Sequence, residues 1–103
     1  MSGRARLALE GELTIYGAAE LQAQLIAALA DAPEGIDIDL SGVTELDSSG
    51  VQLLMATHRA ARASERTVTL CAPSEAVRDV LGLFDLASFF DMAAAALPQG
   101  EPA

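Results

Sequence analysis

The chain has no lysine, no tryptophan, one histidine and one cysteine among its 103 residues. A phosphate-binding P-loop and a Schiff-base site each require a lysine, so both kinds of site are excluded. Zinc sites usually draw on several histidines and cysteines, and His58 has no companion at a metal-ligand spacing. We therefore expect His58 to be a helix-edge residue, and we predict no metal, no cofactor and no enzymatic activity.

Cys71 is the single cysteine, so an internal disulfide is impossible, in agreement with a reducing compartment. No lysine or histidine lies near it in sequence to activate the thiol, so a redox role is not expected. The sequence contains neither an apolar run of the roughly 18 residues that span a bilayer nor a signal-peptide core. These features predict a cytoplasmic protein.

Basic residues are scarce and scattered, with six arginines against 15 acidic residues and a net charge of -9. Nucleic acid and anionic membranes are therefore poor partners on electrostatic grounds. Hydrophobic residues make up 51% of the chain, which excludes a generally disordered protein. The length fits one core, and we expect a domain over residues 1–97 with a frayed tail over 98–103.

Apolar and polar residues alternate at the strand period of two in four segments: Leu7/Leu9, Leu13/Ile15, Ile36/Ile38/Leu40 and Val68/Leu70. Helical periodicity covers residues 18–30 and 50–63, and a third helix is expected after Pro73 with Ser74 as its N-cap. The alternation indicates that helices cover only one face of the sheet, so Asp37 and Asp39 are interpreted as a solvated sheet face.

The first two strands are expected to pair as a hairpin through Glu10-Gly11, with right-handed crossovers joining the others. The prediction is a single-domain α/β fold with a mixed four- to five-stranded sheet and helices covering one face. Such a sheet has an edge strand that could pair two copies as a homodimer. Residues 83–92 fit either a helix or a final edge strand.

The turn Asp47-Ser48-Ser49-Gly50 stands where a predicted strand passes into a predicted helix. Helix N-termini offer unpaired N–H groups and a positive dipole end, so an anion can be held there. Ser49 and Gln52 match a capping box, which leaves Ser48 one residue outside the helix with an exposed hydroxyl. Ser48 is thus the preferred phosphate acceptor and Ser49 the second choice, although a serine pair before a helix is more often simply a cap.

This strand, turn and apolar helix resemble the signature of the STAS domain family, which includes the bacterial anti-sigma factor antagonists. Weaker similarities to the family cover residues 10–13, 40–43 and 77–86. The resemblance implies that Ser48 is phosphorylated by a partner Ser/Thr kinase that is also an anti-sigma factor. It also implies that Ser49 caps the helix and that Gly50 allows close backbone approach. Asp47 is either a turn residue that complements the helix dipole or part of kinase recognition.

The partner-binding surface is expected around the turn and the second helix, over Asp47, Ser48, Ser49, Gly50 and Gln52. A phosphate would add about -1.5 to -2 charges beside Glu45 and Asp47, with no arginine close in sequence. We therefore expect phosphorylation to block docking by repulsion and desolvation cost.

The chain departs from typical family members in its short N-terminus and in an abbreviated C-terminal helix over residues 93–97. Residues 13–21 also resemble STAS proteins of chemotaxis-type signalling. Other family members are accessory subunits of lipid-transporting ABC systems, in which the same turn would be a permanent interface and Ser48 would stay unmodified. A sensor that binds a nucleotide at the helix N-terminus is the least supported alternative, because the chain lacks a lysine and a glycine-rich cradle.

Overall fold

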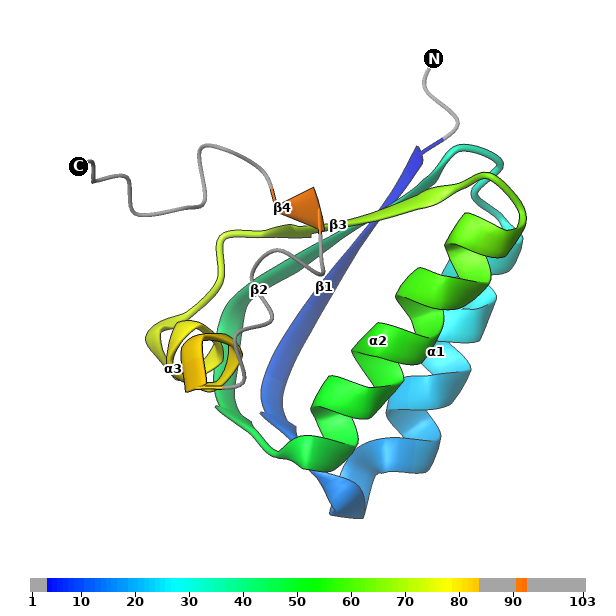
Figure 1. The fold of residues 1–103 in the computed structure, drawn as a ribbon. Coiled ribbons are helices and arrows are strands. Elements are labelled where there is room, and N and C mark those ends of the chain that lie inside the picture. The colour runs from blue at the N-terminus through cyan, green and yellow to red at the C-terminus, as the bar shows by residue number, and fades with distance from the viewer. Residues whose placement is uncertain (1–3, 84–90, 93–103) are drawn as a thin grey trace, which may run out of the picture.

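The computed structural model describes residues 4–83 and 91–92, in which strands and helices alternate along the chain (Figure 1). A short 3-10 helix, η1 (Ile15–Gly17), follows the first strand. The other elements, in chain order, are β1 (Arg4–Leu13), α1 (Ala18–Ala30), β2 (Gly35–Leu46), α2 (Ser48–Ala63), β3 (Thr67–Cys71), α3 (Glu75–Leu83) and β4 (Asp91–Met92).

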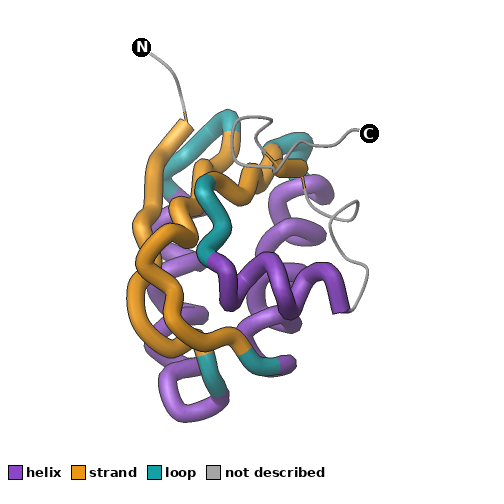
Figure 2. Tube along the Cα trace, turned by 90° about the vertical axis from the view of Figure 1, so that its left-hand side faces the viewer, coloured by secondary structure: helices purple, strands orange, loops and turns teal. Residues whose placement is uncertain are grey.

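The four described strands form one sheet in the order β1-β2-β3-β4, and each neighbouring pair is parallel. Helices α1 and α2 lie side by side on one face of this sheet (Figure 1), and the view turned by 90° shows the strands in front of them (Figure 2). Helix α3 packs against β2. The predicted α/β domain with helices covering one face is confirmed.

The expected hairpin through Glu10-Gly11 is wrong, and so is the mixed strand direction that depended on it, because the described strands are all parallel. Leu7, Leu9 and Leu13 belong to one continuous strand, and every pairing of the described strands is parallel. Gly11 adopts a φ of 79°, a conformation that glycine tolerates, and β1 continues beyond it to Leu13. Two register shifts lie opposite this region, and at each of them β2 carries one residue more than β1.

The core is formed by the alternating residues of the strands and by one stripe from each helix. Within α2, His58 belongs to this stripe and is only 5% exposed, so its placement at a helix edge is wrong. The described residues contain no cluster of potential metal ligands around it. The residues that are completely or almost completely buried include Leu25, Ile36, Ile38, Leu40, Leu54, Val68, Leu70 and Val77.

The opposite face of the sheet is polar, as the alternation predicted. Arg4 and Asp37 form an ion pair at 2.7 Å, and Arg6 and Asp39 form another at 2.9 Å. Cys71 is half-buried at the end of β3, and burial raises the pKa of its thiol. A thiol that ionises less readily is less reactive, which agrees with the structural role expected for it.

The end of the chain is described only in part. Asp91–Met92 form the short strand β4, paired in parallel with Thr69 and Leu70. The rest of the segment predicted as helix or strand, the abbreviated helix over residues 93–97 and the tail over 98–103 lie outside the described residues. None of the described helices is long and apolar enough to cross a membrane.

Candidate functional site: the start of helix α2

Helix α2 is capped by Asp47, which lies at the end of β2. The Asp47 carboxylate accepts hydrogen bonds through Oδ1 from the backbone N–H groups of Ser49, at 2.9 Å, and Gly50, at 3.1 Å. The predicted capping box, with Ser49 as the N-cap, is therefore wrong. Three consecutive residues could have capped this helix, and the carboxylate both accepts two N–H groups and places a negative charge at the positive dipole end.

Asp47 also fastens the start of α2 to the end of β1. Its backbone N–H donates to the Leu13 carbonyl at 3.2 Å. Its second carboxylate oxygen, Oδ2, accepts from the backbone N–H of Ile15 at 3.1 Å. The backbone and side chain of this one residue thus hold together the ends of two strands, the first turn of α2 and the beginning of η1.

Gly50 is buried in the first turn of α2, where the helix meets the end of β1. A Cβ atom at this position would lie 2.5 Å from the Leu13 carbonyl oxygen and 2.7 Å from Leu46 Cδ1. Both separations are too short for real contacts, so only glycine permits the observed approach. The close backbone approach that the family resemblance implied for Gly50 is confirmed.

Ser48 is the first residue of α2, and its side chain is exposed, whereas Ser49 is half-buried. The preference for Ser48 as the more accessible hydroxyl therefore agrees with the structure, although Ser48 lies inside the helix rather than before it. Gln52 is exposed one turn further along. Gly50 is buried, so it shapes the proposed surface and offers no side chain for contact.

Ile15 and Tyr16 are two exposed residues that the sequence reasoning did not assign to the site. Tyr16 is 96% exposed and Ile15 is 64% exposed, and Asp47 binds the backbone of Ile15 directly. Ile15 was interpreted as an inward-facing strand residue, and that prediction is wrong because β1 ends at Leu13. The sequence does contain a signal of an exposed turn here, because a glycine directly follows Tyr16.

The surroundings of Ser48 are acidic. Glu12 and Glu45 are both exposed and lie in register on neighbouring strands close to the turn, and Asp47 precedes Ser48 directly. Arg6 of β1 is too far from the turn to offset these charges. It lies seven residues before Leu13, the strand end that contacts the turn, which at strand spacing is about 23 Å. It is moreover paired with Asp39.

The anion-binding site expected at the start of α2 is already occupied by the Asp47 carboxylate. The Ser49 and Gly50 N–H groups, which would face an anion at the start of α2, donate to the Asp47 carboxylate instead. A phosphate on Ser48 would meet that carboxylate rather than free donors. The same observation weakens the interpretation of the site as a nucleotide sensor.

The fold and the site together define the class of protein. It is an α/β domain whose candidate binding site is the turn between β2 and α2. A family model described as "Mlab, STAS domain" matches residues 2–98, and the chain belongs to the STAS domain family. Among curated proteins, the anti-sigma-B factor antagonist of Staphylococcus epidermidis is 28% identical over 79 residues, covering 74% of this chain and 73% of its own length.

Two solved structures show the same fold. The crystal structure of a Thermotoga maritima protein assigned as an anti-sigma factor antagonist matches with a TM-score of 0.79 at 22% identity, covering 89% of this chain and 80% of that one. The anti-sigma factor antagonist SpoIIAA in its unphosphorylated form matches with a TM-score of 0.66 at 23% identity, covering 90% and 82%. This chain is thus a STAS domain similar to anti-sigma factor antagonists.

Proposed function

We propose that this domain is a non-enzymatic regulatory binding protein that is switched by reversible phosphorylation of Ser48. The enzyme that adds the phosphate is a partner Ser/Thr kinase of the anti-sigma factor or chemotaxis type, in the cytoplasm. The observation that carries the proposal is the exposed Ser48 hydroxyl on the first turn of a helix whose start is rigidly held by Asp47.

Similarity to known proteins supports this proposal. The Staphylococcus epidermidis relative is named for antagonism of an anti-sigma factor, a function exerted on another protein. The structure of SpoIIAA is described as its unphosphorylated form, so phosphorylation belongs to the description of that protein. We extend both properties, protein binding and phosphorylation, to this chain.

The partner surface that we propose combines an apolar and a polar part. The apolar part is Ile15 and Tyr16, which expose large side chains beside the turn. Aromatic side chains of this kind often contribute most of the binding energy when a partner buries them. The polar part is the rim of Asp47, Ser48, Ser49 and Gln52, with Gly50 keeping the turn close to β1.

Phosphorylation would act on this surface by repulsion. A phosphoserine adds about -1.5 to -2 charges. That charge would lie next to Asp47 and close to Glu12 and Glu45, which already make the surface acidic. A partner that desolvates Ser48 in the complex would have to bury this charge without a counterion from β1, so the modified protein dissociates.

The test uses a Ser/Thr kinase that co-purifies with the full chain from its own cells. We expect that the kinase transfers phosphate to the wild type and to Ser49→Ala, and that Ser48→Ala accepts none. In calorimetry, Ser48→Ala should bind like the wild type, whereas Ser48→Asp should bind at least about tenfold more weakly, a loss of about 1.4 kcal/mol. Equal binding of the alanine and aspartate variants would overturn the proposal.

A constitutive subunit of a lipid-transporting ABC complex is the second candidate. The exposed pair Ile15 and Tyr16 would suit a permanent interface equally well. In that case the partner is an ABC ATPase encoded nearby, Ser48 carries no phosphate in cells, and Tyr16→Ala releases the subunit from the complex. Co-purification with such an ATPase, combined with an unmodified Ser48, would replace the switch by this function.

A further inference from the structure

Strand β1 lies at one edge of the sheet that the described strands form. It spans ten residues, Arg4–Leu13, and pairs on one side with β2, with register shifts at Ala8/Glu10 and Gly11/Glu12. No strand among the described residues covers its other edge. A long open edge offers a row of backbone N–H and C=O groups to which another strand can add.

The charged residues of β1 are sorted by sign along its length. Arg4 and Arg6 lie in its first half, and Glu10 and Glu12 lie in its second half. All four occupy even positions, so they share the polar face of the sheet with Ala8. Charges on an edge strand normally discourage pairing. Here an antiparallel second copy would bring opposite charges together.

We propose that a second copy of this chain pairs with β1 in antiparallel orientation, with a two-fold axis at Ala8. In this register Arg6 stands opposite Glu10 of the second copy, and Arg4 stands opposite its Glu12. On the other face, Leu7 stands opposite Leu9. Each contact occurs twice because the interface is symmetric, and opposite charges on directly facing strand residues are stabilising.

The pattern of β1 selects this register over its neighbours. A shift by one residue would place the arginines of the second copy on the face that carries Leu7, which is partly buried, and Leu9, which is buried. A shift by two residues in either direction would leave one arginine and one glutamate of each copy without their opposite charge. Only the axis at Ala8 matches all four charges.

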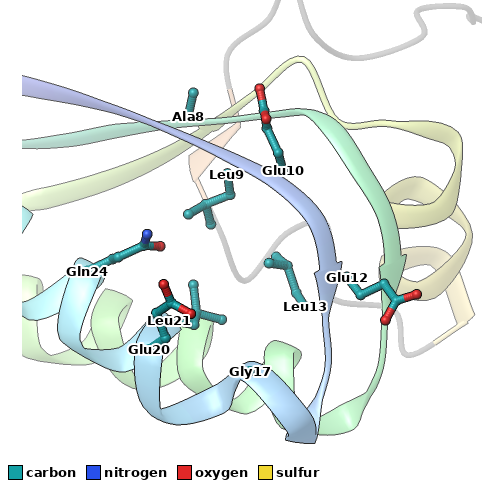
Figure 3. A pocket seen from close by; sticks show the side chains of 9 residues that line it. All are labelled: Ala8, Leu9, Glu10, Glu12, Leu13, Gly17, Glu20, Leu21 and Gln24. Atoms are coloured by element: carbon teal, nitrogen blue, oxygen red, sulfur yellow. The ribbon is translucent and has the colours of Figure 1, made fainter.

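The surface beside β1 is open on the side of α1. A hollow of about 300 Å³ lies between β1 and α1 (Figure 3). In this view Ala8 and Glu10 point away from Leu9 and Leu13, which point toward α1. The hollow is lined by Ala8, Leu9, Glu10, Glu12, Leu13, Gly17, Glu20, Leu21 and Gln24.

The inner pair, Arg6 with Glu10, contributes most to this interface. The Arg6 side chain is 62% exposed, and its ion pair with Asp39 uses the nitrogen Nη2, so further guanidinium donors can reach a second carboxylate. Arg4, by contrast, already donates to Asp37, Thr67 and Thr69. The outer pair therefore adds mainly long-range attraction.

This inference does not depend on phosphorylation of Ser48. In the antiparallel pair the two copies of the Ser48 turn would lie at opposite ends of the joined strands, roughly 30 Å apart along them. Both turns would remain open to a partner. Loss of the dimer and loss of the switch can therefore be observed separately.

Sedimentation equilibrium on the full chain, at about 0.15 M salt to screen the repulsion between two acidic molecules, tests the proposal. We expect a reversible monomer–dimer equilibrium. Arg6→Glu and Glu10→Arg should each weaken the dimer about tenfold, because two symmetric attractions become repulsions. The double variant Arg6→Glu/Glu10→Arg restores opposite charges across the axis and should recover the wild-type affinity to within about threefold.

Glu75→Arg is the matched control, since it reverses an exposed charge on α3 and should leave the dimer unchanged. Glu10→Arg also leaves the Arg6–Asp39 pair intact, and circular dichroism verifies that each variant is folded. A chain that is monomeric up to about 1 mM would overturn the proposal. So would a dimer that the single charge reversals leave intact, or one that the double variant fails to restore.

Discussion

The two ends of the β1–β2 pair treat charge in opposite ways. Toward the start of these strands, Arg4 pairs with Asp37 and Arg6 pairs with Asp39 across the polar face. Toward their ends, Glu12 and Glu45 lie in register with the same sign of charge, beside the exposed Ile15 and Tyr16. At the start of the strands the charged side chains are paired with each other within the domain. At the end of the strands the acidic side chains are exposed to solvent.

This difference identifies where the chain departs from what folding alone would favour. Like charges on facing strand residues cost stability, typically some tenths of a kcal/mol. A fully exposed Tyr16 adds nothing to the core. Both features lie around Ser48 and not around the arginine pairs. Residues that do not stabilise the fold therefore gather at the end of the sheet where binding is proposed.

Gly50→Ala should have the largest effect on stability, because it disrupts the close packing of the first turn of α2 against the end of β1. Its Cβ would meet the Leu13 carbonyl oxygen at 2.5 Å, and a backbone oxygen cannot turn aside as a flexible side chain does. We expect a loss in the free energy of unfolding at the upper end of about 1–3 kcal/mol in urea titration.

Gly82→Ala is the control for that experiment. Gly82 also lies in a helix, α3, but nothing stands within 4 Å of a Cβ built there. The substitution should be neutral or slightly stabilising, because alanine favours helix more than glycine does. Equal losses at Gly50 and Gly82 would contradict the close packing of α2 against β1.

Asp47→Ala should have the next largest effect, since it removes the cap of α2 and the bond to the Ile15 backbone. We expect a loss of about 1–2 kcal/mol by thermal or chemical unfolding. Ser49→Ala should change stability by less than about 0.5 kcal/mol, because Ser49 does not cap the helix. If Ser49→Ala proved the costlier of the two, the capping box expected from the sequence would be right and the described geometry wrong.

Asp39→Asn tests the start of the β1–β2 pair, where Arg6 and Asp39 form an ion pair, and should have a smaller effect on stability. A hydrogen bond from the Ser41 backbone N–H, together with the Ser41 side chain and Arg6, lowers the pKa of Asp39 below its ordinary 3.8. The ionised carboxylate therefore stabilises the folded state above that value, and this contribution is lost as the pH falls through the lowered pKa.

The measurement for Asp39 is the melting temperature between pH 6 and pH 2, buffers chosen at about one-unit steps. Wild type should lose stability below about pH 4, and Asp39→Asn should start lower at neutral pH and decline less steeply on acidification. Parallel curves for the two proteins would show that Asp39 does not contribute to acid sensitivity.

Tyr16→Ala should have the smallest effect on stability and a large one on binding. A side chain that is 96% exposed has little to lose on truncation, so the free energy of unfolding should change by less than about 0.5 kcal/mol. Affinity for the partner kinase should fall by at least about 1 kcal/mol if Tyr16 is buried in the complex. Unchanged affinity would remove Tyr16 from the proposed surface.

The helices and the buried strand faces could be predicted from periodicity. The expected helix over residues 18–30 agrees with α1 at both ends, and Ile36, Ile38 and Leu40 are fully buried as the alternation required. These predictions succeeded because burial of one face imposes a repeat that a single sequence carries.

The turns were harder to predict from the sequence, because their conformation depends on contacts between residues that are distant in the chain. Asp47, Ser48 and Ser49 could each cap a helix, and the choice of Asp47 follows from the contact of its second carboxylate oxygen with Ile15. Gly11 resembles a hairpin turn locally, yet β1 continues through it, because its residues on both sides of Gly11 pair with the parallel strand β2. Ser48 was placed correctly as the exposed hydroxyl, although the reason given for it was wrong.

Peptide mass spectrometry of the protein purified from its own cells, with and without phosphatase treatment, is the most direct test of the switch. We expect a single phosphate on Ser48 that phosphatase removes and that is absent from Ser48→Ala. An unmodified Ser48 across growth and stress conditions, or a phosphate found on Ser49 instead, would contradict it.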